Sequence, residues 1–446
     1  MFDYLKYIQP LWYYHLAFHA VNDSLLNDLF TQSVIHIESD KRYASEDAIK
    51  MDMVYRALQI GVIPQGTISQ NKNVKFQTIT HRNDNYIFVA KYFGKAKLVY
   101  VLLLRMICLN NPILELLGFF KAIKVQKIDI TLNHCAYEDF NTFQSQIMQL
   151  NPLVTVVIPT LNRYEYLKDV LKDLEGQDYQ NFEVIICDQT DVIPDDFYSG
   201  WKLNIQLIKQ EEKALWLARN RCIKQAKGEY ILLFDDDSRV EPNWITNHLK
   251  CLDYFKVKVS AGVTHTLVGH GLGKKESYFH LSDVFDTGNS MVHIDVFKQI
   301  GLFDRQFEKM RMGDGEFGLR AILGGFLIVS NPYAMRIHLK VETGGLRQMG
   351  SWDALRPKSL FAPRPVPSVL YLARKYFGNT AAKFYLIQNI PFSFIPYKFK
   401  KSKYLKLTFL IVLPLLIPVM LVVVIKAWSK ASQMLNEGAK ITQFTV

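Results

Sequence analysis

The sequence predicts an α/β fold in which a mainly parallel sheet is flanked by helices, and two observations support this. From residue 152 onward, strand-like and helix-like patterns alternate, which favours parallel strands joined by crossover helices. The strand-like segments are also continuous apolar runs, such as VTVVIP (Val154–Pro159) and YILLF (Tyr230–Phe234). Runs of this kind are typical of strands buried on both faces.

Each element of this region is expected from its own pattern. Val154–Pro159 is the first strand, and a helix over Tyr164–Glu175 follows with its leucines and valine on one face. The later elements are expected as strands at Glu183–Asp188 and Asn204–Ile208, a helix at Ala214–Ala226 and a strand at Tyr230–Phe234. Ligands bind such sheets beyond the carboxyl ends of the strands, so we expect the site there.

Residues 1–150 are predicted to form an N-terminal α+β accessory region, and they carry no motif that we can tie to chemistry. Near its end, residues 97–127 contain two apolar runs, interrupted by Arg105, by Asn110–Pro112 and by Glu115. Neither run reaches the roughly 20 residues that a membrane span needs. The segment is therefore either an amphipathic interfacial helix or a buried core helix.

The C-terminal part is predicted to be associated with a membrane. We expect a basic, aromatic interfacial segment over 356–404 with a helix at Ser368–Ile387, a transmembrane anchor over 405–427, and a tail over 428–446. The uncharged run Leu407–Ile425 is long enough to cross a bilayer, although a re-entrant hairpin bent at Pro414 and Pro418 is the alternative. Lysines crowd its upstream side, so the preceding domain is expected on the cytoplasmic face of the inner membrane.

Composition narrows the possible partners. The chain has 53 Lys and Arg against 42 Asp and Glu, a formal net charge of +11, which fits nucleic acid, an anionic membrane or phosphate-bearing ligands. The lysines gather beside the apolar segment and form no stripe with interleaved aromatics, so no nucleic-acid partner is expected. Five scattered cysteines without a CxxC pair argue against a disulfide framework or structural zinc.

Three adjacent carboxylates, Asp235–Asp237, directly follow the apolar run Tyr230–Phe234. Like charges this close repel one another and raise one another's pKa, and a bound divalent cation relieves that repulsion. Mg²⁺ or Mn²⁺ suits such hard oxygen ligands and can bridge two phosphates. A solvated acidic turn that caps the next helix is the alternative.

Five segments, in this order and spacing, resemble family 2 glycosyltransferases of the GT-A fold. They are VTVVIPTLNRYEYLKDVLKDL, FEVIICDQTD, LARNRCIKQAKGEYILLFDDD, GNSMVHIDVFKQIGLFD and MGDGEFGLRAILGG, and the resemblance covers roughly residues 152–350. It implies a GT-A domain over 151–355 that transfers a sugar from a nucleotide-diphosphate donor with inversion. It also implies Mn²⁺ or Mg²⁺ as the cofactor.

The resemblance also implies a role for each matching position. The donor would be held by a set of residues that surrounds the nucleotide and its diphosphate: Pro159, Thr160, Asn162, Asp188, Arg219, Asn220, Asp235 and Asp236. Asp237 would bind the metal, with His338 as a candidate further ligand, and Arg347 could close over the diphosphate. The segment Gly288, Asn289 and Ser290 would border the transferred sugar and the acceptor, where glycine permits close backbone approach.

Asp314 is the expected general base, in the place where the family carries an acidic pair at the start of a helix. The sequence departs from that pair because Gly313 stands where a glutamate is common. Glu316 is the second candidate and is also expected near the acceptor, although a helix turns it about 200° from Asp314. Asp314 could equally serve as a helix N-cap, and the two roles can coexist.

The sequence thus predicts an inverting glycosyltransferase that moves a single sugar, with a UDP-sugar favoured, to a saccharide or lipid-linked acceptor in surface polysaccharide synthesis. A processive synthase is the first alternative, but its Gln-x-x-Arg-Trp motif is not matched by Arg347-Gln348 and Trp352. A nucleotidyltransferase would need a glycine-rich loop after the first strand, and residues 160–164 contain no glycine. A non-catalytic scaffold of the same fold is expected to lose the acidic triplet or Asp314.

Overall fold

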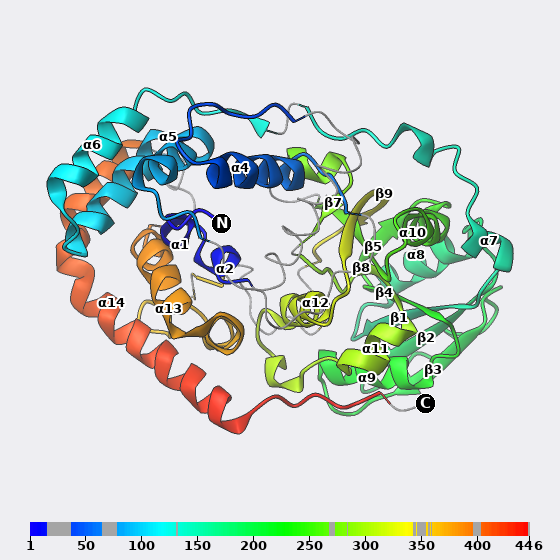
Figure 1. The fold of residues 1–446 in the computed structure, drawn as a ribbon. Coiled ribbons are helices and arrows are strands. Elements are labelled where there is room, and N and C mark those ends of the chain that lie inside the picture. The colour runs from blue at the N-terminus through cyan, green and yellow to red at the C-terminus, as the bar shows by residue number, and fades with distance from the viewer. Residues whose placement is uncertain are drawn as a thin grey trace.

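The computed structural model describes residues 1–15, 37–64, 78–130, 133–266, 273–282, 284–341, 345, 354–355, 357, 359–395 and 403–444. Its centre is a nine-stranded sheet in the order β3-β2-β1-β4-β8-β6-β9-β5, with β7 paired to β9 (Figure 1). The strands are β1 (Val154–Thr160), β2 (Phe182–Asp188), β3 (Ile205–Lys209), β4 (Tyr230–Phe234), β5 (Ser238–Val240), β6 (Val259–Thr266), β7 (His280–Leu281), β8 (Asn289–His293) and β9 (Ile328–His338).

The sheet confirms the predicted α/β class, and its two halves differ in strand direction. The half that was expected from the alternating pattern is parallel: β1 pairs with both β2 and β4, and β2 pairs with β3. The other half is mixed, because β8 runs antiparallel to both β4 and β6. Between the paired strands β6 and β8, the described residues form a 3₁₀ turn and β7 but no α-helix, and parallel strands are usually joined by a helical crossover.

Helices cover both faces of the sheet, so successive residues of β1 enter different cores, as the period of a strand requires. Val156 packs into one core with α8 (Tyr164–Glu175) and α10 (Trp244–Tyr254). Val157 packs into the other with α9 (Leu215–Gln225), α11 (Ile294–Ile300) and α12 (Gly313–Leu323). Burial on both faces explains why the strands read as continuous apolar runs.

The described part of residues 1–150 is helical, which corrects the predicted mixture of helix and strand. Its helices are α1 (Leu5–Ile8), α2 (Pro10–Tyr13), α4 (Glu46–Gln59), α5 (Arg82–Ile107), α6 (Pro112–Ala122) and α7 (Gln146–Leu150), with a short 3₁₀ turn at Glu138–Phe140. The extended pairing described there is a single bridge between Phe2 and Ile79. The turn signals that suggested strands connect helices, whose buried faces form a core rich in tyrosine and phenylalanine.

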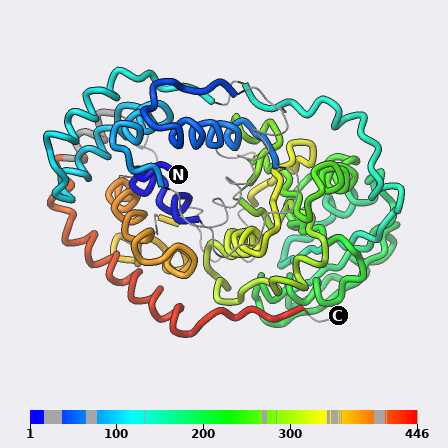
Figure 2. The backbone as a smooth tube through the Cα atoms, viewed as in Figure 1, coloured from blue at the N-terminus to red at the C-terminus, as the bar shows by residue number. Residues whose placement is uncertain are grey.

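This helical region contacts both the sheet domain and the C-terminal helices. Phe140 lies with Phe279 at the sheet edge, ring centroids 4.7 Å apart, and Tyr7 meets Phe384 edge-on at 5.2 Å. Residues 133–150 run along the outer edge of the molecule to reach α7 and the sheet domain (Figure 2). The N-terminal region therefore joins the sheet domain to the C-terminal helices.

The C-terminal helices are α13 (Pro367–Ser393) and α14 (Lys403–Glu437). The first contains the predicted helix Ser368–Ile387, and the second extends the predicted apolar segment Leu407–Ile425 in both directions. Within the described residues, Ile411–Glu437 is the one helical stretch long and apolar enough to cross a membrane, judged by length and composition. Both helices contribute to the core that also contains α9 and α12.

Glu115 fixes α6 against the helical region. Its buried carboxylate accepts hydrogen bonds from Arg105 (2.8 Å), Arg82 (3.0 Å) and the Tyr86 hydroxyl (2.7 Å). Burial opposes its ionisation, but Arg105 and Tyr86 hold the pKa of Glu115 below its usual value. Glu115, which in the sequence only interrupted an apolar run, is thus a structural anchor.

Replacing this anchor should destabilise the fold. Glu115→Ala leaves two arginines beside a buried site without their carboxylate, and breaking such a pair costs about 3 kcal/mol. Urea unfolding of the purified chain would measure this loss. The matched control is Glu211→Ala at an exposed position, where a change within about 0.5 kcal/mol is expected. Equal stabilities of the two variants would contradict the anchoring role.

Candidate active site

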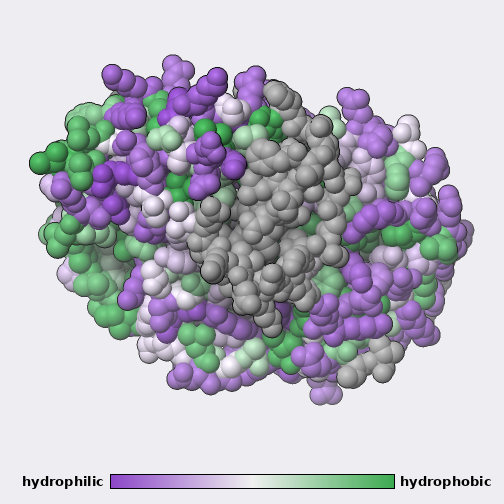
Figure 3. Space-filling model, in the orientation of Figure 1, coloured by the Kyte–Doolittle hydropathy of each residue, from purple (hydrophilic) through white to green (hydrophobic). Residues whose placement is uncertain are grey.

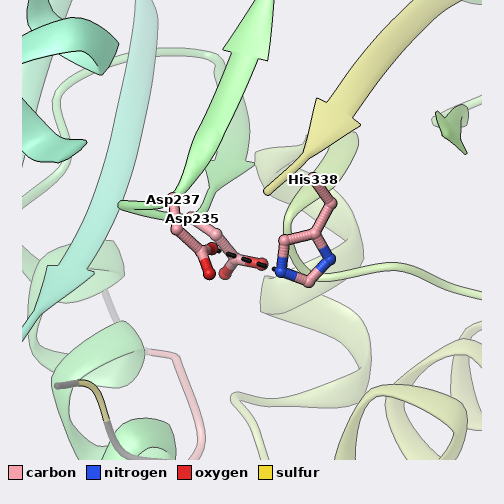
Figure 4. A group of neighbouring side chains, drawn as sticks. All are labelled: Asp235, Asp237 and His338. Carbon is pink, nitrogen blue, oxygen red and sulfur yellow. Dashed lines mark ion pairs between the residues drawn. The ribbon is translucent and has the colours of Figure 1, made fainter. Parts of the chain in front are cut away.

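The acidic triplet lies where the carboxyl end of β4 meets β9. Residue Ser238, at the start of β5, pairs with His338 at the end of β9, and this register brings the His338 ring beside Asp237. The imidazole Nε2 lies 3.2 Å from Asp237 Oδ1 (Figure 4). One potential ligand atom from each of Asp235, Asp237 and His338 lies within 4.8 Å of the other two. The structure thus brings together the predicted metal ligand Asp237, the candidate ligand His338 and Asp235, which was predicted to bind the donor.

The chemistry of these three side chains fits a divalent cation. Two carboxylates and an imidazole make a mixed oxygen and nitrogen set, which suits Mn²⁺ well and Mg²⁺ through its oxygens. Asp237 is almost fully buried. Burial and the neighbouring Asp235 act to raise its pKa, but the interactions with His338 and the charge of Arg163 together hold the pKa of Asp237 below its usual value. The carboxylate is therefore ionised at neutral pH, as a metal ligand must be.

Asp236, the middle member, points away from this group and toward β1. It accepts hydrogen bonds from Thr160 Oγ1 at 2.8 Å and from Arg163 Nη1 at 3.0 Å. Burial, opposed by Arg163 and assisted by the adjacent Asp237, raises the pKa of Asp236 to about 6. Asp236 and the predicted donor residue Thr160 thus tie the triplet to the first strand, and Arg163 is a site residue that the sequence analysis did not single out.

Asp235 is held by two arginines. Arg336 Nη1 donates to its Oδ2 at 2.8 Å and Arg219 Nη2 donates to its Oδ1 at 2.7 Å, and these charges overcome burial and keep the pKa of Asp235 well below its usual range. Arg336 also pairs with Asp286 at 2.9 Å. Neither Arg336 nor Asp286 was predicted, because each stands alone in the sequence without a charge pattern around it.

The ion pair between Asp235 and Arg336 lies close to the backbone at Gly288, and a glycine is needed there. A Cβ at this position would lie 2.1 Å from Arg336 Nη1 and 2.2 Å from Asp235 Oδ2, so any larger residue would displace the ion pair. The neighbouring Ser290 has a buried hydroxyl with no hydrogen-bond partner among the described residues. The expected close approach at Gly288 therefore exists, and it is made by Asp235 and Arg336.

Arg219 and Asn220, which were predicted together as donor-binding residues, make different contacts. Arg219 is buried, and its Nε and Nη1 have no hydrogen-bond partner among the described residues, so the guanidinium retains donors for an anionic ligand. Asn220 uses both ends of its amide on the Phe303 backbone, donating to the carbonyl and accepting from the N–H at 2.9 Å each. Asn220 thus fixes the loop after α11, and Arg219 carries the capacity for anion binding.

Asp314 opens α12 close to the same charges. Residue Met312 before it adopts a left-handed conformation at φ 78°, and Asp314 Oδ1 accepts the Gly315 N–H at 2.7 Å. Burial raises the pKa of Asp314, Asp286 raises it further, and Arg219 acts in the opposite direction. Asp314 is therefore near enough to Arg219 and Asp286 to feel their charges, as a base beside the donor must be.

The structure explains why the acidic pair is missing at this helix. A Cβ on Gly313 would lie 2.3 Å from the ring of Trp216, whose indole N–H donates to the Phe307 carbonyl at 3.0 Å. Trp216 thus occupies the space that a glutamate at position 313 would need.

Two predicted residues have their side chains elsewhere. The buried Glu316 carboxylate pairs with Arg320 at 3.0 Å and accepts the Tyr376 hydroxyl of α13, which leaves Asp314 as the candidate base. Asn289 is fully buried and accepts the Trp244 indole N–H at 2.8 Å while donating to the Ala334 carbonyl at 2.9 Å. Both side chains connect elements of the fold. They were expected to lie beside the sugar or the acceptor.

The residues predicted to bind the nucleotide lie at the tips of β1 and β2. Pro159 is buried within β1, and Asn162 follows in an exposed left-handed turn at φ 54°. Asp188 Oδ2 accepts the hydroxyls of Tyr164 and Tyr198, each at 2.7 Å, so the predicted base-binding carboxylate already has two aromatic donors. Arg347, expected over the diphosphate, lies outside the described residues.

The fold and this site define a GT-A type glycosyltransferase domain. Residues 155–301 match the family model described as glycosyl transferase family 2, in agreement with the resemblance found in the sequence. The match covers about a third of the chain, which leaves the helical N-terminal region and the C-terminal helices outside it.

The curated relatives agree with the family. The chain is similar to the amylovoran biosynthesis glycosyltransferase AmsB of Erwinia amylovora, 32% identical over 22% of this chain and 35% of the relative. It is also similar to a dolichyl N-acetyl-α-D-glucosaminyl phosphate 3-β-D-2,3-diacetamido-2,3-dideoxy-β-D-glucuronosyltransferase of Methanococcus voltae, 24% identical over 40% and 64% of the two chains. The chain thus spans less than two thirds of either relative.

A solved structure gives a more distant likeness. S. aureus TarS 1-349 in complex with UDP-GlcNAc is 18% identical, and the superposition covers 64% of this chain and 92% of that one with a TM-score of 0.44.

Removing a candidate metal ligand should abolish metal-linked binding. Asp237→Ala takes one of three ligand groups from the site, so we expect Mn²⁺ affinity to fall roughly 100-fold. Calorimetric titration with MnCl₂ alone measures this, and Asp191→Ala at an exposed position is the matched control. Unchanged Mn²⁺ binding by the Asp237 variant would rule out Asp237 as a ligand.

Proposed function

We propose that this protein is an inverting, metal-dependent glycosyltransferase that moves a single sugar from a nucleotide-diphosphate donor, with a UDP-sugar favoured, to a saccharide or lipid-linked acceptor. The observation that carries the proposal is the convergence of a candidate metal group, Asp235, Asp237 and His338, with a buried guanidinium that has unused donors. A diphosphate leaving group requires such a combination of cation and hydrogen-bond donors.

The donor diphosphate would lie between the carboxylates of β4 and Arg219. Asp237 and His338, with Asp235, would hold a divalent cation, which supplies charge neutralisation for the departing diphosphate. Arg219 would donate its free N–H groups to a phosphate oxygen. Arg336 and Arg163 would keep the triplet ionised and oriented, because each one neutralises a carboxylate that would otherwise repel its neighbours.

Asp314 would act as the general base for the acceptor. Its carboxylate takes the proton of the acceptor hydroxyl as that oxygen attacks the anomeric carbon of the donor sugar. The bond from this carbon to the phosphate oxygen breaks on the opposite side, its electron pair stays with the nucleoside diphosphate, and the configuration inverts.

Surface polysaccharide synthesis is the proposed pathway class. Support comes from the amylovoran biosynthesis relative and from the chemistry of a donor site on a chain with a long apolar helix. The proposed setting is the cytoplasmic face of the inner membrane, where nucleotide sugars are available.

Asp314→Asn should stop transfer and leave donor binding intact. Loss of the general base lowers kcat by about 10² to 10⁴-fold, because the amide cannot accept the acceptor proton. Single-turnover transfer, with donor binding measured separately, distinguishes the two effects, and Asp195→Asn on the exposed surface is the control. Near-normal turnover in the Asp314 variant would exclude its role as base.

The same carboxylate predicts a pH dependence. Burial raises the pKa of Asp314 above the ordinary value of an aspartate, so its protonated form persists to higher pH and kcat/KM should fall as pH drops through the raised pKa. The sign for stability is opposite: ionising the buried group costs stability as pH rises through that pKa. Asp314→Asn should therefore be more stable than wild type at pH 7 and lose this advantage below the ordinary pKa.

The proposed activity itself is tested by a donor screen. Purified full-length protein is incubated with a panel of nucleotide sugars and MnCl₂, and release of nucleoside diphosphate is measured for each donor. We expect release from one donor class, abolished by chelation with EDTA and by Asp237→Ala. Release from no donor, with Mn²⁺ binding intact, would favour the non-catalytic scaffold.

A further inference from the structure

The long apolar helix α14 has one exposed face and one packed face. Its exposed side carries large apolar residues along more than three turns, including Ile411 (76% exposed), Leu415 (78%), Leu421 (57%) and Ile425 (64%). Its opposite side is buried with the core of the sheet domain, through residues that recur at helical spacing: Met420, Val423, Ala427, Ala431 and Met434. The helix is therefore covered by protein along one side for much of its length.

The last turns of α14 are fixed to α13. Arg374 of α13 donates to the Trp428 carbonyl at 3.1 Å and to Ser432 Oγ at 2.7 Å, and its guanidinium lies 4.2 Å from the Trp428 ring centroid. These contacts lie beyond the uncharged run Leu407–Ile425, and they join this end of α14 to a helix that packs in the same core as α9 and α12.

The tail after α14 returns to the catalytic domain. The Leu302 N–H donates to the Thr442 carbonyl at 2.9 Å, and the Lys440 N–H donates to Asp304 Oδ1 at 2.8 Å. Gln306 also donates to the Gly438 carbonyl at 2.8 Å. Residues 438–442 thus lie against the segment between α11 and α12. A helix that spanned a membrane would separate this tail from the domain it contacts.

A second apolar face is presented by α6. Ile113, Leu117 and Phe120 are 68%, 63% and 59% exposed, while Glu115 holds the other side of the helix in place. The exposed lysines Lys121 and Lys124 follow this face. In the view of Figure 1, α6 and the first half of α14 lie at the same end of the molecule, and apolar surface is visible at that end in Figure 3.

From these contacts we infer that α14 does not cross the membrane but lies in the plane of one leaflet of an anionic phospholipid bilayer, with α6 as a second contact and with the C-terminal tail on the catalytic side. Helices in this position bury an apolar face at the boundary of headgroups and acyl chains and are supported by nearby lysines. Pro414 and Pro418 lie on the exposed face, and water at this boundary can satisfy the carbonyls that they leave without a helical donor. This inference does not depend on the proposed reaction.

Cysteine labelling tests the position of the tail. In a full-length background with Cys108 and Cys135 replaced by serine, single cysteines are introduced as Gln443→Cys in the exposed tail and as Val192→Cys on the exposed surface of the sheet domain. Each protein is added to preformed vesicles of phosphatidylglycerol and phosphatidylethanolamine, recovered by flotation and treated with an impermeant maleimide. We expect both cysteines to react equally without detergent. Protection of the tail cysteine until detergent is added would show a spanning helix and overturn the inference.

Flotation of charge variants tests the membrane contact itself. Leu415→Glu with Leu421→Glu, and separately Leu117→Glu with Phe120→Glu, should each reduce the vesicle-bound fraction at least tenfold. Ser429→Glu on the exposed polar part of α14 is the control and should bind nearly as well as wild type. Far-UV circular dichroism verifies that each variant is folded. Unchanged flotation of both double variants, or conversion of a dimer to a monomer by them without an effect on flotation, would overturn the lipid assignment.

Discussion

The arrangement of the site depends on pairing three adjacent carboxylates, two of them buried and one partly buried, with cations that come from distant parts of the chain. Each arginine takes a different place: Arg163 follows the first strand and holds Asp236, Arg219 comes from α9, and Arg336 comes from β9. Without them, mutual repulsion would keep the triplet protonated or exposed. Because the cations are fixed by separate elements, the sheet must be fully assembled before the acidic group has its final geometry.

The sequence was most informative where one local pattern determines the outcome. Burial on both faces makes β1 and β4 continuous apolar runs, and an acidic triplet directly after such a run locates the site at the sheet edge. His338 was proposed from its place in the segment MRIHLK, and the structure shows that it ends β9. The position of its ring beside Asp237 depends on the register of β5 on β9. The three residues of β5 are too few for this register to be predicted from the sequence.

The sequence could not predict the side-chain contacts that depend on tertiary packing. Asn289 and Glu316 belong to motif segments, yet their side chains satisfy the buried Trp244 indole and Arg320, because polar groups in a core must be hydrogen-bonded. Arg336 and Asp286 are isolated in the chain and meet only in the folded sheet. The helical nature of the described part of residues 1–150 was missed for a related reason: its helices are stabilised by aromatic packing and have weak amphipathic periodicity.

The contact between Gly313 and Trp216 links two positions nearly one hundred residues apart in the chain. An acidic residue cannot return to position 313 while the indole fills that volume, and shrinking the indole first would leave a void beside Phe303. Each single substitution is therefore harmful on its own, although the double change need not be. A side chain at position 313 therefore requires a smaller one at position 216, and the two positions are coupled through this single contact.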